Sequence, residues 1–313
     1  MKRALLLAIA ACCLSCIDVV AAPPDAHLSG SLTSVGSDTA SALVTRWADA
    51  FHALHANAHI QVQASGSASA PIALIEDAAD IGSMSRPMSA AEIAQFQARY
   101  GYPPTRFVVA RDAIVVFVHP DNPLRRITLA QLDAIYSATR RCGATTAIHR
   151  WRDLDADVNA AFGDTPVLAS GRNSSSGTYE MFRESALCGG EYRADVIAWP
   201  GNGAVVATVV ANREAIGYAG IGYVNGLVKP LVLATNDVDA GVAPSLANIV
   251  AGRYPLARAL YVYVNRPPDH ALAALPNAFI AYALSDEGQA LVNQEGFIAL
   301  SASERASQRA ALD

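Results

Sequence analysis

Residues 28–54 read LSGSLTSVGSDTASALVTRWADAFHAL, and this stretch sets the pattern that the rest of the chain follows. Its first part alternates loosely between apolar and polar residues, as a strand does, and residues 40–54 carry apolar residues at helical spacing. The polar segment Gly36-Ser37-Asp38-Thr39 lies between the two. The stretch therefore predicts a strand, a Gly/Ser-rich loop and a helix, in that order.

The same order of elements recurs further along the chain. Residues 59–63 are predicted to form a strand, residues 64–67 a Gly/Ser-rich loop and residues 68–77 a helix. The starts of two more helices are marked by the capping boxes Ser89 with Glu92 and Thr128 with Gln131. Further strands are expected at residues 80–83, 166–168, 195–198, 215–218, 231–234 and 260–264. Helices are expected at residues 178–187 and within residues 271–293, where two helical stretches are split near Ser285. This alternation predicts an α/β fold.

Residues 107–118 end in the apolar run Ile114-Val115-Val116-Phe117-Val118. Such a run is typical of a strand that is buried on both faces of a parallel sheet. The chain has 313 residues, whereas single hydrophobic cores stop growing near roughly 250–300 residues. We therefore expect two lobes, each a mainly parallel sheet flanked by helices.

The chain has no flexible linker, so we expect it to cross between the lobes more than once. Crossings are expected near residues 118–121 and 223–227. They divide the mature chain into a first lobe of residues 23–117 and 228–313 and a second lobe of residues 118–227.

Charge is scarce in this chain. Charged residues make up 16% of it and the formal net charge is −5, whereas a nucleic-acid-binding domain normally presents a basic patch or stripe. We therefore expect no nucleic acid partner, and any functional charge is expected to be local.

The first residues have the features of a secretory signal peptide. Met1-Lys2-Arg3 is basic, residues 4–11 are apolar, and Val20-Ala21-Ala22 offers a small-residue cleavage site. We expect residues 1–22 to be removed on export to the periplasm. An alternative is lipidation at Cys12, because residues 9–12 read IAAC, which resembles a lipoprotein cleavage box.

The mature chain keeps two cysteines, Cys142 and Cys188. In an oxidising compartment such a pair most simply forms one disulfide. The alternative is two separate free thiols.

Three Gly/Ser/Thr-rich loops each end a predicted strand and begin a predicted helix: Gly36-Ser37-Asp38-Thr39, Gly66-Ser67-Ala68-Ser69 and Ser174-Ser175-Ser176-Gly177-Thr178. A helix N-terminus offers unpaired backbone N–H groups and the positive end of the helix dipole, which attract anions. Ligands in open α/β sheets lie outside the carboxyl ends of the strands, so these loops are expected to converge in a cleft. The alternative for each loop is an ordinary helix cap.

The third loop carries the strongest indication of anion binding. Arg172 precedes it, and a guanidinium group presents a planar fork that fits a tetrahedral oxyanion. Ser176, Gly177 and Thr178 add hydroxyls, a backbone N–H next to no Cβ, and a helix N-terminus. The loop therefore predicts a site for a phosphate-like oxyanion.

Other motifs accompany this loop: Gly36-Ser37-Asp38-Thr39, Asp80-Ile81-Gly82-Ser83, Ala215-Ile216-Gly217-Tyr218 and Leu284-Ser285-Asp286-Glu287-Gly288-Gln289. Together they resemble the periplasmic phosphate-binding proteins of ABC transporters, through most of the mature chain. The spacing Arg-x-x-x-Ser-Gly-Thr is the most specific of these features. The resemblance implies a type II periplasmic-binding fold with two lobes that close on a ligand by hinge motion.

The resemblance also implies the partners and the site. The chain would bind inorganic phosphate or a related oxyanion as a monomer, without cofactor, metal or catalytic residues, and deliver it to the membrane permease of an ABC transporter. The residues that would bind the anion are Thr39 and Ala40 from the first loop, Ser67 from the second, and Arg172, Ser176, Gly177 and Thr178 from the third.

Two positions depart from the family pattern. The family places a carboxylate after the strand that begins at Asp80 and another two residues after its arginine, whereas this chain has Ser85 and Ser174 there. A carboxylate acceptor favours phosphate over fully ionised sulfate, so the selectivity of this chain is left open. Asp38 is the nearest candidate substitute, Arg86 is a candidate second cation, and Ser85 is a further candidate ligand-binding residue. The alternative for Asp38 and Arg86 is a helix cap or a surface residue.

The main alternative function is a secreted phosphatase or other phosphoester hydrolase. The chain has neither a Gly-x-Ser-x-Gly elbow nor the Gly-Lys-Ser/Thr of a P-loop. His52, His55 and His59 are expected on one face of a helix, without a cysteine or acidic cluster that would complete a metal site. A third alternative is a surface protein that keeps the fold but has lost its ligand.

Overall fold

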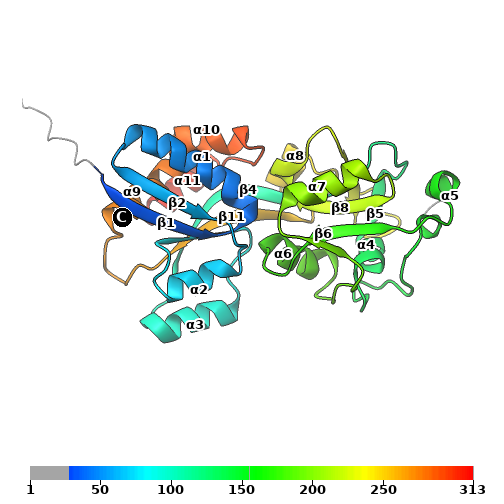
Figure 1. Cartoon of the computed structure of the whole chain (residues 1–313), viewed down its shortest axis with the longest axis horizontal. Coiled ribbons are helices and arrows are strands. Elements are labelled where there is room, and N and C mark those ends of the chain that lie inside the picture. The colour runs from blue at the N-terminus through cyan, green and yellow to red at the C-terminus, as the bar shows by residue number, and fades with distance from the viewer. Residues whose placement is uncertain (1–27, 155, 313) are drawn as a thin grey trace, which may run out of the picture.

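The chain folds into two lobes that lie side by side along the long axis of the molecule (Figure 1). The computed structural model describes residues 28–154 and 156–312. The expected signal peptide at residues 1–22 and the alternative lipid attachment at Cys12 lie outside this part of the chain. None of the helices within the described residues is long and apolar enough to cross a membrane.

The first lobe is built on five neighbouring strands of one large sheet. In spatial order they are β2 (Ala58–Gln63), β1 (Gly30–Gly36), β3 (Ile81–Met84), β11 (Ala257–Val264) and the first part of β4 (Thr105–Val118). β1, β2 and β3 are parallel, and β11 runs antiparallel to β3 and β4. The helices of this lobe are α1 (Asp38–Leu54), α2 (Ser69–Ile75), α3 (Ala90–Tyr100), α9 (Ala274–Ala283), α10 (Asp286–Gln294) and α11 (Ala302–Arg309).

Both faces of this sheet are covered, and β11 shows how. Because successive side chains of a strand point to opposite faces, Val262 and Tyr263 belong to different cores. Val262 packs in the cluster that contains Trp47 of α1 and Phe279 of α9. Tyr263 packs in a second cluster with Phe96 of α3.

The second lobe continues the same sheet through β8 (Ala215–Gly220), β6 (Leu168–Arg172) and β7 (Ile197–Trp199). These three strands are parallel, and β8 pairs antiparallel with the last part of β4. The smaller strands are β5 (Arg126–Thr128), β9 (Lys229–Pro230) and β10 (Val232–Ala234). The helices are α4 (Leu129–Tyr136), α5 (Ala156–Phe162), α6 (Gly177–Ala186), α7 (Asn202–Ala211) and α8 (Leu246–Val250), with single 3-10 turns η1 (Trp151–Asp153) and η2 (Ile221–Tyr223).

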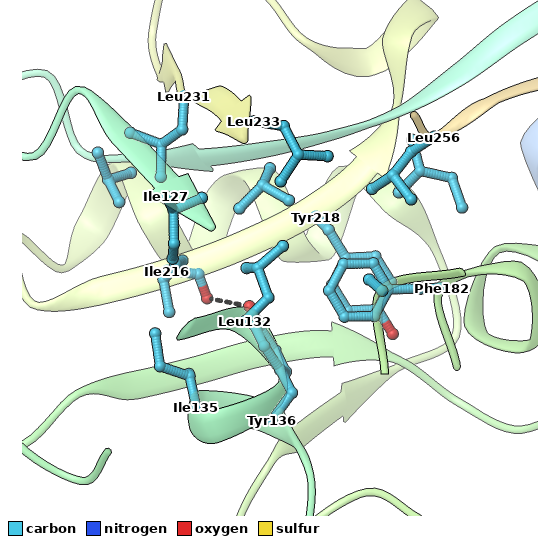
Figure 2. Packing of buried hydrophobic residues seen from close by; sticks show 14 of the residues in the cluster. Ile127, Leu132, Ile135, Tyr136, Phe182, Ile216, Tyr218, Leu231, Leu233 and Leu256 are labelled. Carbon is cyan, nitrogen blue, oxygen red and sulfur yellow. Dashed lines mark hydrogen bonds between the residues drawn. The ribbon is translucent and has the colours of Figure 1, made fainter. Parts of the chain in front are cut away.

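The core of the second lobe lies between the sheet and helices α4 and α6 (Figure 2). The rings of Phe182 and Tyr218 stack with centroids 3.8 Å apart. The hydroxyl of Tyr136 donates to the carbonyl oxygens of Ser170 and Ile216, at 3.2 and 3.0 Å. These contacts fix β6, and therefore Arg172 at its end, against the helices.

The strand β4 joins the two lobes. It pairs with β11 from Thr105 to Ala113 and with β8 from Ile114 to Val118. The predicted burial of its apolar run on both faces is confirmed, because Val116 and Phe117 lie in different core clusters. The prediction of a parallel sheet at this strand is wrong, since β8, β9 and β11 all pair with it in antiparallel fashion. An apolar run of this kind indicates that both faces of the strand are covered. It does not indicate whether the neighbouring strands are parallel or antiparallel.

The expected α/β fold with two lobes is confirmed, but residues 228–256 pack differently from the expected division. Leu231, Leu233 and Leu256 lie in the same cluster as Leu132 of the second lobe. We propose that the lobes divide within β4, near Ala113, and at the start of β11, near Ala257. On this proposed division, the chain stays in the second lobe after residues 223–227.

Local signals in the sequence match the structure closely. Both capping boxes are present, at the N-termini of α3 and α4. The expected split of residues 271–293 near Ser285 is the boundary between α9 and α10. The predicted disulfide between Cys142 and Cys188 is confirmed, with the two Cα atoms 5.4 Å apart.

Candidate functional site

The three Gly/Ser-rich loops meet where the two lobes face each other. The Ala68 N–H of the second loop donates to the Ser175 carbonyl oxygen of the third at 3.1 Å. A Cβ on Gly66, whose φ is +100°, would lie 2.4 Å from that same oxygen, and a Cβ on Gly177 would lie 2.4 Å from Ser67 Oγ. Only glycine permits this close approach, so the loops are in direct contact.

The first loop begins α1 with a serine cap. Ser37 Oγ accepts the N–H of Ala40 at 3.2 Å, and the Ser37 N–H donates to the Ser83 carbonyl at 2.7 Å. Asp38 lies in the first helical turn, where a carboxylate is favoured by the helix dipole. The cap therefore positions Asp38 and Thr39 at the end of the helix that faces the second lobe.

Arg172 lies at the end of β6 and its side chain is 0% exposed. Its Nη2 bonds Asp38 Oδ1 of the other lobe at 2.5 Å and the Pro200 carbonyl at 2.7 Å, while Nε reaches the Trp199 carbonyl at 3.4 Å. Among the residues that the structure describes, Nη1 of Arg172 is buried and has no hydrogen-bond partner. This arm of the fork is a donor that the protein itself leaves unused.

Two threonine hydroxyls join the lobes beside this arginine. Thr39 Oγ1 and Thr178 Oγ1 lie 2.8 Å apart, and both side chains are buried. Asn202 Nδ2 donates to Thr39 Oγ1 at 3.1 Å and to Asp38 Oδ2 at 3.2 Å. Arg258 Nη2 donates to Thr178 Oγ1 at 2.9 Å.

The predicted anion-binding residues are brought together at this point, though some of their groups serve the protein. Ser176 caps α6 and its Oγ accepts the Thr178 N–H at 3.1 Å, so that this N–H, like that of Ala40, is used by a cap. Ser67 Oγ lies 3.2 Å from Ser85 Oγ and accepts the Ser85 N–H at 3.0 Å. Thr39, Ser67 and Gly177 remain clustered around the same contact between lobes.

The residues named where the chain departs from the family pattern have different environments in the structure. Asp38 is the ion-pair partner of Arg172. Ser85 is buried beside Ser67, whereas Ser174 is exposed. Arg86 gives both arms of its guanidinium to Glu92, at 2.7 and 2.6 Å, so the expected second cation is committed within its own lobe.

Two buried tyrosines support the site as neutral groups. Burial raises the pKa of Tyr218 to about 12, and its hydroxyl accepts the Arg172 N–H at 3.3 Å. Burial, together with the nearby charge of Asp38, raises the pKa of Tyr223 to about 12. The Tyr223 hydroxyl donates to the Asp38 carbonyl at 3.1 Å. Both tyrosine hydroxyls are therefore uncharged and form hydrogen bonds with the backbone of site residues.

Two further residues of the site, Asn202 and Arg258, were not predicted from the sequence. Asn202 follows Gly201 and precedes an apolar run, a pattern that marks a helix start, and α7 begins there. Arg258 is a charged residue within the apolar strand β11, as Asp112 is within β4. Charged residues are almost never fully buried unless paired, so two of them in apolar strands were the available signal.

The histidines do not lie on one helical face, contrary to expectation. His52 lies in α1, His55 follows its last turn, and His59 lies in β2. The rings of His52 and His59 are 5.3 Å apart. Within the described part of the chain, no group of three or more metal-ligating side chains is found.

The chain matches one known protein family and is similar to several named proteins. A family described as "PBP superfamily domain" matches residues 21–287. The phosphate-binding protein PstS of Pseudomonas aeruginosa is 45% identical over 275 residues, which cover 88% of this chain and 84% of the relative. The protein SphX of Synechococcus elongatus is 29% identical over 305 residues, covering 96% and 86%.

Solved structures agree with the fold. An ABC-type phosphate transport receptor from Vibrio cholerae matches with a TM-score of 0.66 and 24% identity, covering 86% of this chain and 100% of that one. The Pseudomonas aeruginosa relative is a phosphate-binding protein by name, in keeping with the expectation of a binding protein. The resemblance noted in the sequence is confirmed: the chain belongs to the PBP superfamily, and within it to the family of the phosphate-binding protein PstS.

Proposed function

We propose that this protein captures phosphate between its two lobes for import by an ABC transporter. The observation that carries the proposal is Arg172, a buried guanidinium with one unpartnered arm at the junction of three loops and two helix N-termini. A buried donor without a partner is costly unless a ligand uses it. The name of the relative that is 45% identical supports phosphate as that ligand.

The proposed ligand-binding residues are those that meet at this junction. Arg172 Nη1 would donate a charge-assisted hydrogen bond to one oxygen of the anion. The N-termini of α1 and α6 would contribute their dipoles. The full proposed set is Thr39, Ala40, Ser67, Arg172, Ser176, Gly177 and Thr178.

Asp38 is the proposed acceptor for the proton of a protonated phosphate. Its Oδ1 accepts a hydrogen bond from Arg172 Nη2, and its Oδ2 accepts one from Asn202 Nδ2. A carboxylate has about four lone-pair sites, so capacity for a ligand hydroxyl remains. Sulfate has no proton to give at neutral pH and would face this carboxylate with a charged oxygen. Asp38 would therefore favour phosphate or arsenate over sulfate.

The proposed setting is the periplasm, with the protein acting as a monomer that delivers its ligand to a membrane permease. The lobes are joined through β4 and β11, so closure and opening would be hinge motions about these strands. No covalent step is required.

Calorimetric titration of the mature chain tests this function directly. We expect phosphate to bind and Arg172→Ala to abolish the heat of binding, while Arg46→Ala, an exposed arginine on α1, keeps it. Phosphate at a hundredfold excess over its dissociation constant should add about 2.7 kcal/mol of stability. Turnover of p-nitrophenyl phosphate that is lost in Arg172→Ala would instead support a hydrolase. If no oxyanion stabilises the protein, the proposal is wrong.

A further inference from the structure

A buried ion pair lies where the chain crosses between the lobes. Asp112 of β4 is 0% exposed and Arg258 of β11 is 8% exposed, and β4 and β11 are the strands that run between the lobes in Figure 1. Arg258 Nε and Nη2 lie 2.8 and 2.7 Å from Asp112 Oδ2. Asp112 Oδ1 accepts the backbone N–H groups of Ala113 and Ile221, at 2.7 and 3.0 Å. The carboxylate is therefore fully engaged and holds Arg258 in one orientation.

The ion pair is linked to the proposed anion site through the hydroxyl of Thr178. Arg258 Nη2 also donates to Thr178 Oγ1, and Thr178 Oγ1 lies 2.8 Å from Thr39 Oγ1. On the other side, Asn202 Nδ2 donates to Thr39 Oγ1. The amide orientation of Asn202 is set by its Oδ1, which accepts the Gly220 N–H at 3.2 Å.

The number of hydrogens on the Thr39 and Thr178 hydroxyls limits how many hydrogen bonds they can donate. A guanidinium group and an amide nitrogen can only donate, so Thr178 and Thr39 each accept one hydrogen bond from them. Each hydroxyl has one hydrogen, and one of the two hydrogens is used in the bond between the threonines. The other hydrogen is left to donate to a third group.

We infer that Arg258, held by Asp112, and Asn202 are positioning residues that make the Thr39–Thr178 pair a hydrogen-bond donor to the bound anion. The inference rests on the proposed function, because the third group is the ligand. Neither positioning residue belongs to the proposed ligand-binding set. Because Arg258 lies on a crossing strand and Thr178 begins a helix of the second lobe, the same contact ties the orientation of the hydroxyls to lobe closure.

The test is a double-mutant cycle on phosphate affinity, measured by calorimetry. Arg258→Lys keeps a positive charge beside Asp112 but cannot supply the same fork, and we expect it to weaken binding about tenfold. Thr178→Val removes the hydroxyl and should weaken binding by at least that factor. In the Thr178→Val background, Arg258→Lys should change affinity less than about twofold, because its effect passes through the hydroxyl.

Thr178→Ser, which keeps a hydroxyl, is the matched control and should restore the tenfold sensitivity to Arg258→Lys. A general structural role would instead weaken binding by the same factor in every background, and that result would overturn the inference. So would unchanged affinity in Arg258→Lys. If Arg258→Lys fails to fold, the neutral pair Asp112→Asn with Arg258→Gln replaces it, with the same expectations. Wild-type protein that binds no phosphate would overturn the proposed function and this inference with it.

Discussion

Arg86 follows β3 in the first lobe and Arg172 ends β6 in the second, and these two buried arginines use their guanidinium groups in different ways. Both arms of Arg86 bond the carboxylate of Glu92, six residues away in the same lobe. Arg172 pairs with Asp38, 134 residues away in the other lobe, and keeps Nη1 without a partner among the described residues. The first arginine is saturated locally, whereas the second bridges the lobes and has a donor to spare.

The partners of a buried cation therefore decide its role. A fork that is filled by a neighbouring carboxylate stabilises the local structure and has nothing to offer a ligand. A fork with one free arm at a helix N-terminus carries an unsatisfied donor that an anion can complete. Each of the following predictions tests this contrast.

The largest expected effect is on phosphate affinity in Arg172→Ala. Truncating one partner of a buried, hydrogen-bonded charge pair costs roughly 2–5 kcal/mol in binding, which is at least about thirtyfold in affinity. Arg86→Ala is expected to leave affinity within about twofold, because Arg86 donates to Glu92 and Pro87. Isothermal titration of both variants makes the comparison. A loss of similar size in Arg86→Ala would show that the two arginines act together on the ligand.

The next effect is on the stability of the ligand-free protein. Arg86→Ala leaves Glu92 without its bidentate partner in a site where the two side chains are only 11% and 19% exposed. We expect a loss of about 2 kcal/mol in the free energy of unfolding, between the values for surface and buried pairs. Urea unfolding should show a lower midpoint at an unchanged slope. An unchanged midpoint would mean that Arg86 does not stabilise the first lobe.

Asp38→Asn is expected to change selectivity more than stability. The amide can still accept from Arg172, but it presents no negative charge to a sulfate oxygen. We expect the ratio of phosphate to sulfate affinity to fall about tenfold, a change of about 1.4 kcal/mol. Asp49→Asn, an exposed position on the same helix, is the control. A ratio that does not move would assign the selectivity to another group.

Much of this site could be predicted from the sequence because its signals are local. A serine or glycine that begins a helix and an arginine that ends a strand each follow from a few neighbouring residues, so Ser37, Arg172 and Ser176 lie where the motif puts them. The same holds for the capping boxes. The disulfide followed instead from a count, because the expected mature chain has only two cysteines to pair.

The partners of these residues could not be predicted, since they depend on how distant segments meet. The Arg86–Glu92 pair spans only six residues, but the pairing depends on how the chain folds between them, so Arg86 was a candidate second cation. Asn202 and Arg258 reach Thr39 and Thr178 across 163 and 80 residues. Residues 228–256 were expected in the first lobe, whereas Leu231, Leu233 and Leu256 pack in the same cluster as Leu132 of α4, and such packing leaves no local mark in the sequence.

The smallest expected effect is on acid unfolding, and it concerns the Arg86–Glu92 pair. Burial alone would raise the pKa of Glu92, but hydrogen bonds from Arg86 and Ser89 outweigh it and hold the pKa below its ordinary value of 4.5. A carboxyl with a lowered pKa adds stability that is full above the unfolded value and is lost as pH falls through the folded value. The stability difference between wild type and Glu92→Gln should therefore be constant above about pH 5 and shrink below about pH 4. Urea unfolding at a series of pH values measures it, and a difference that persists into acid would assign the stability to packing of the Glu92 side chain instead of its charge.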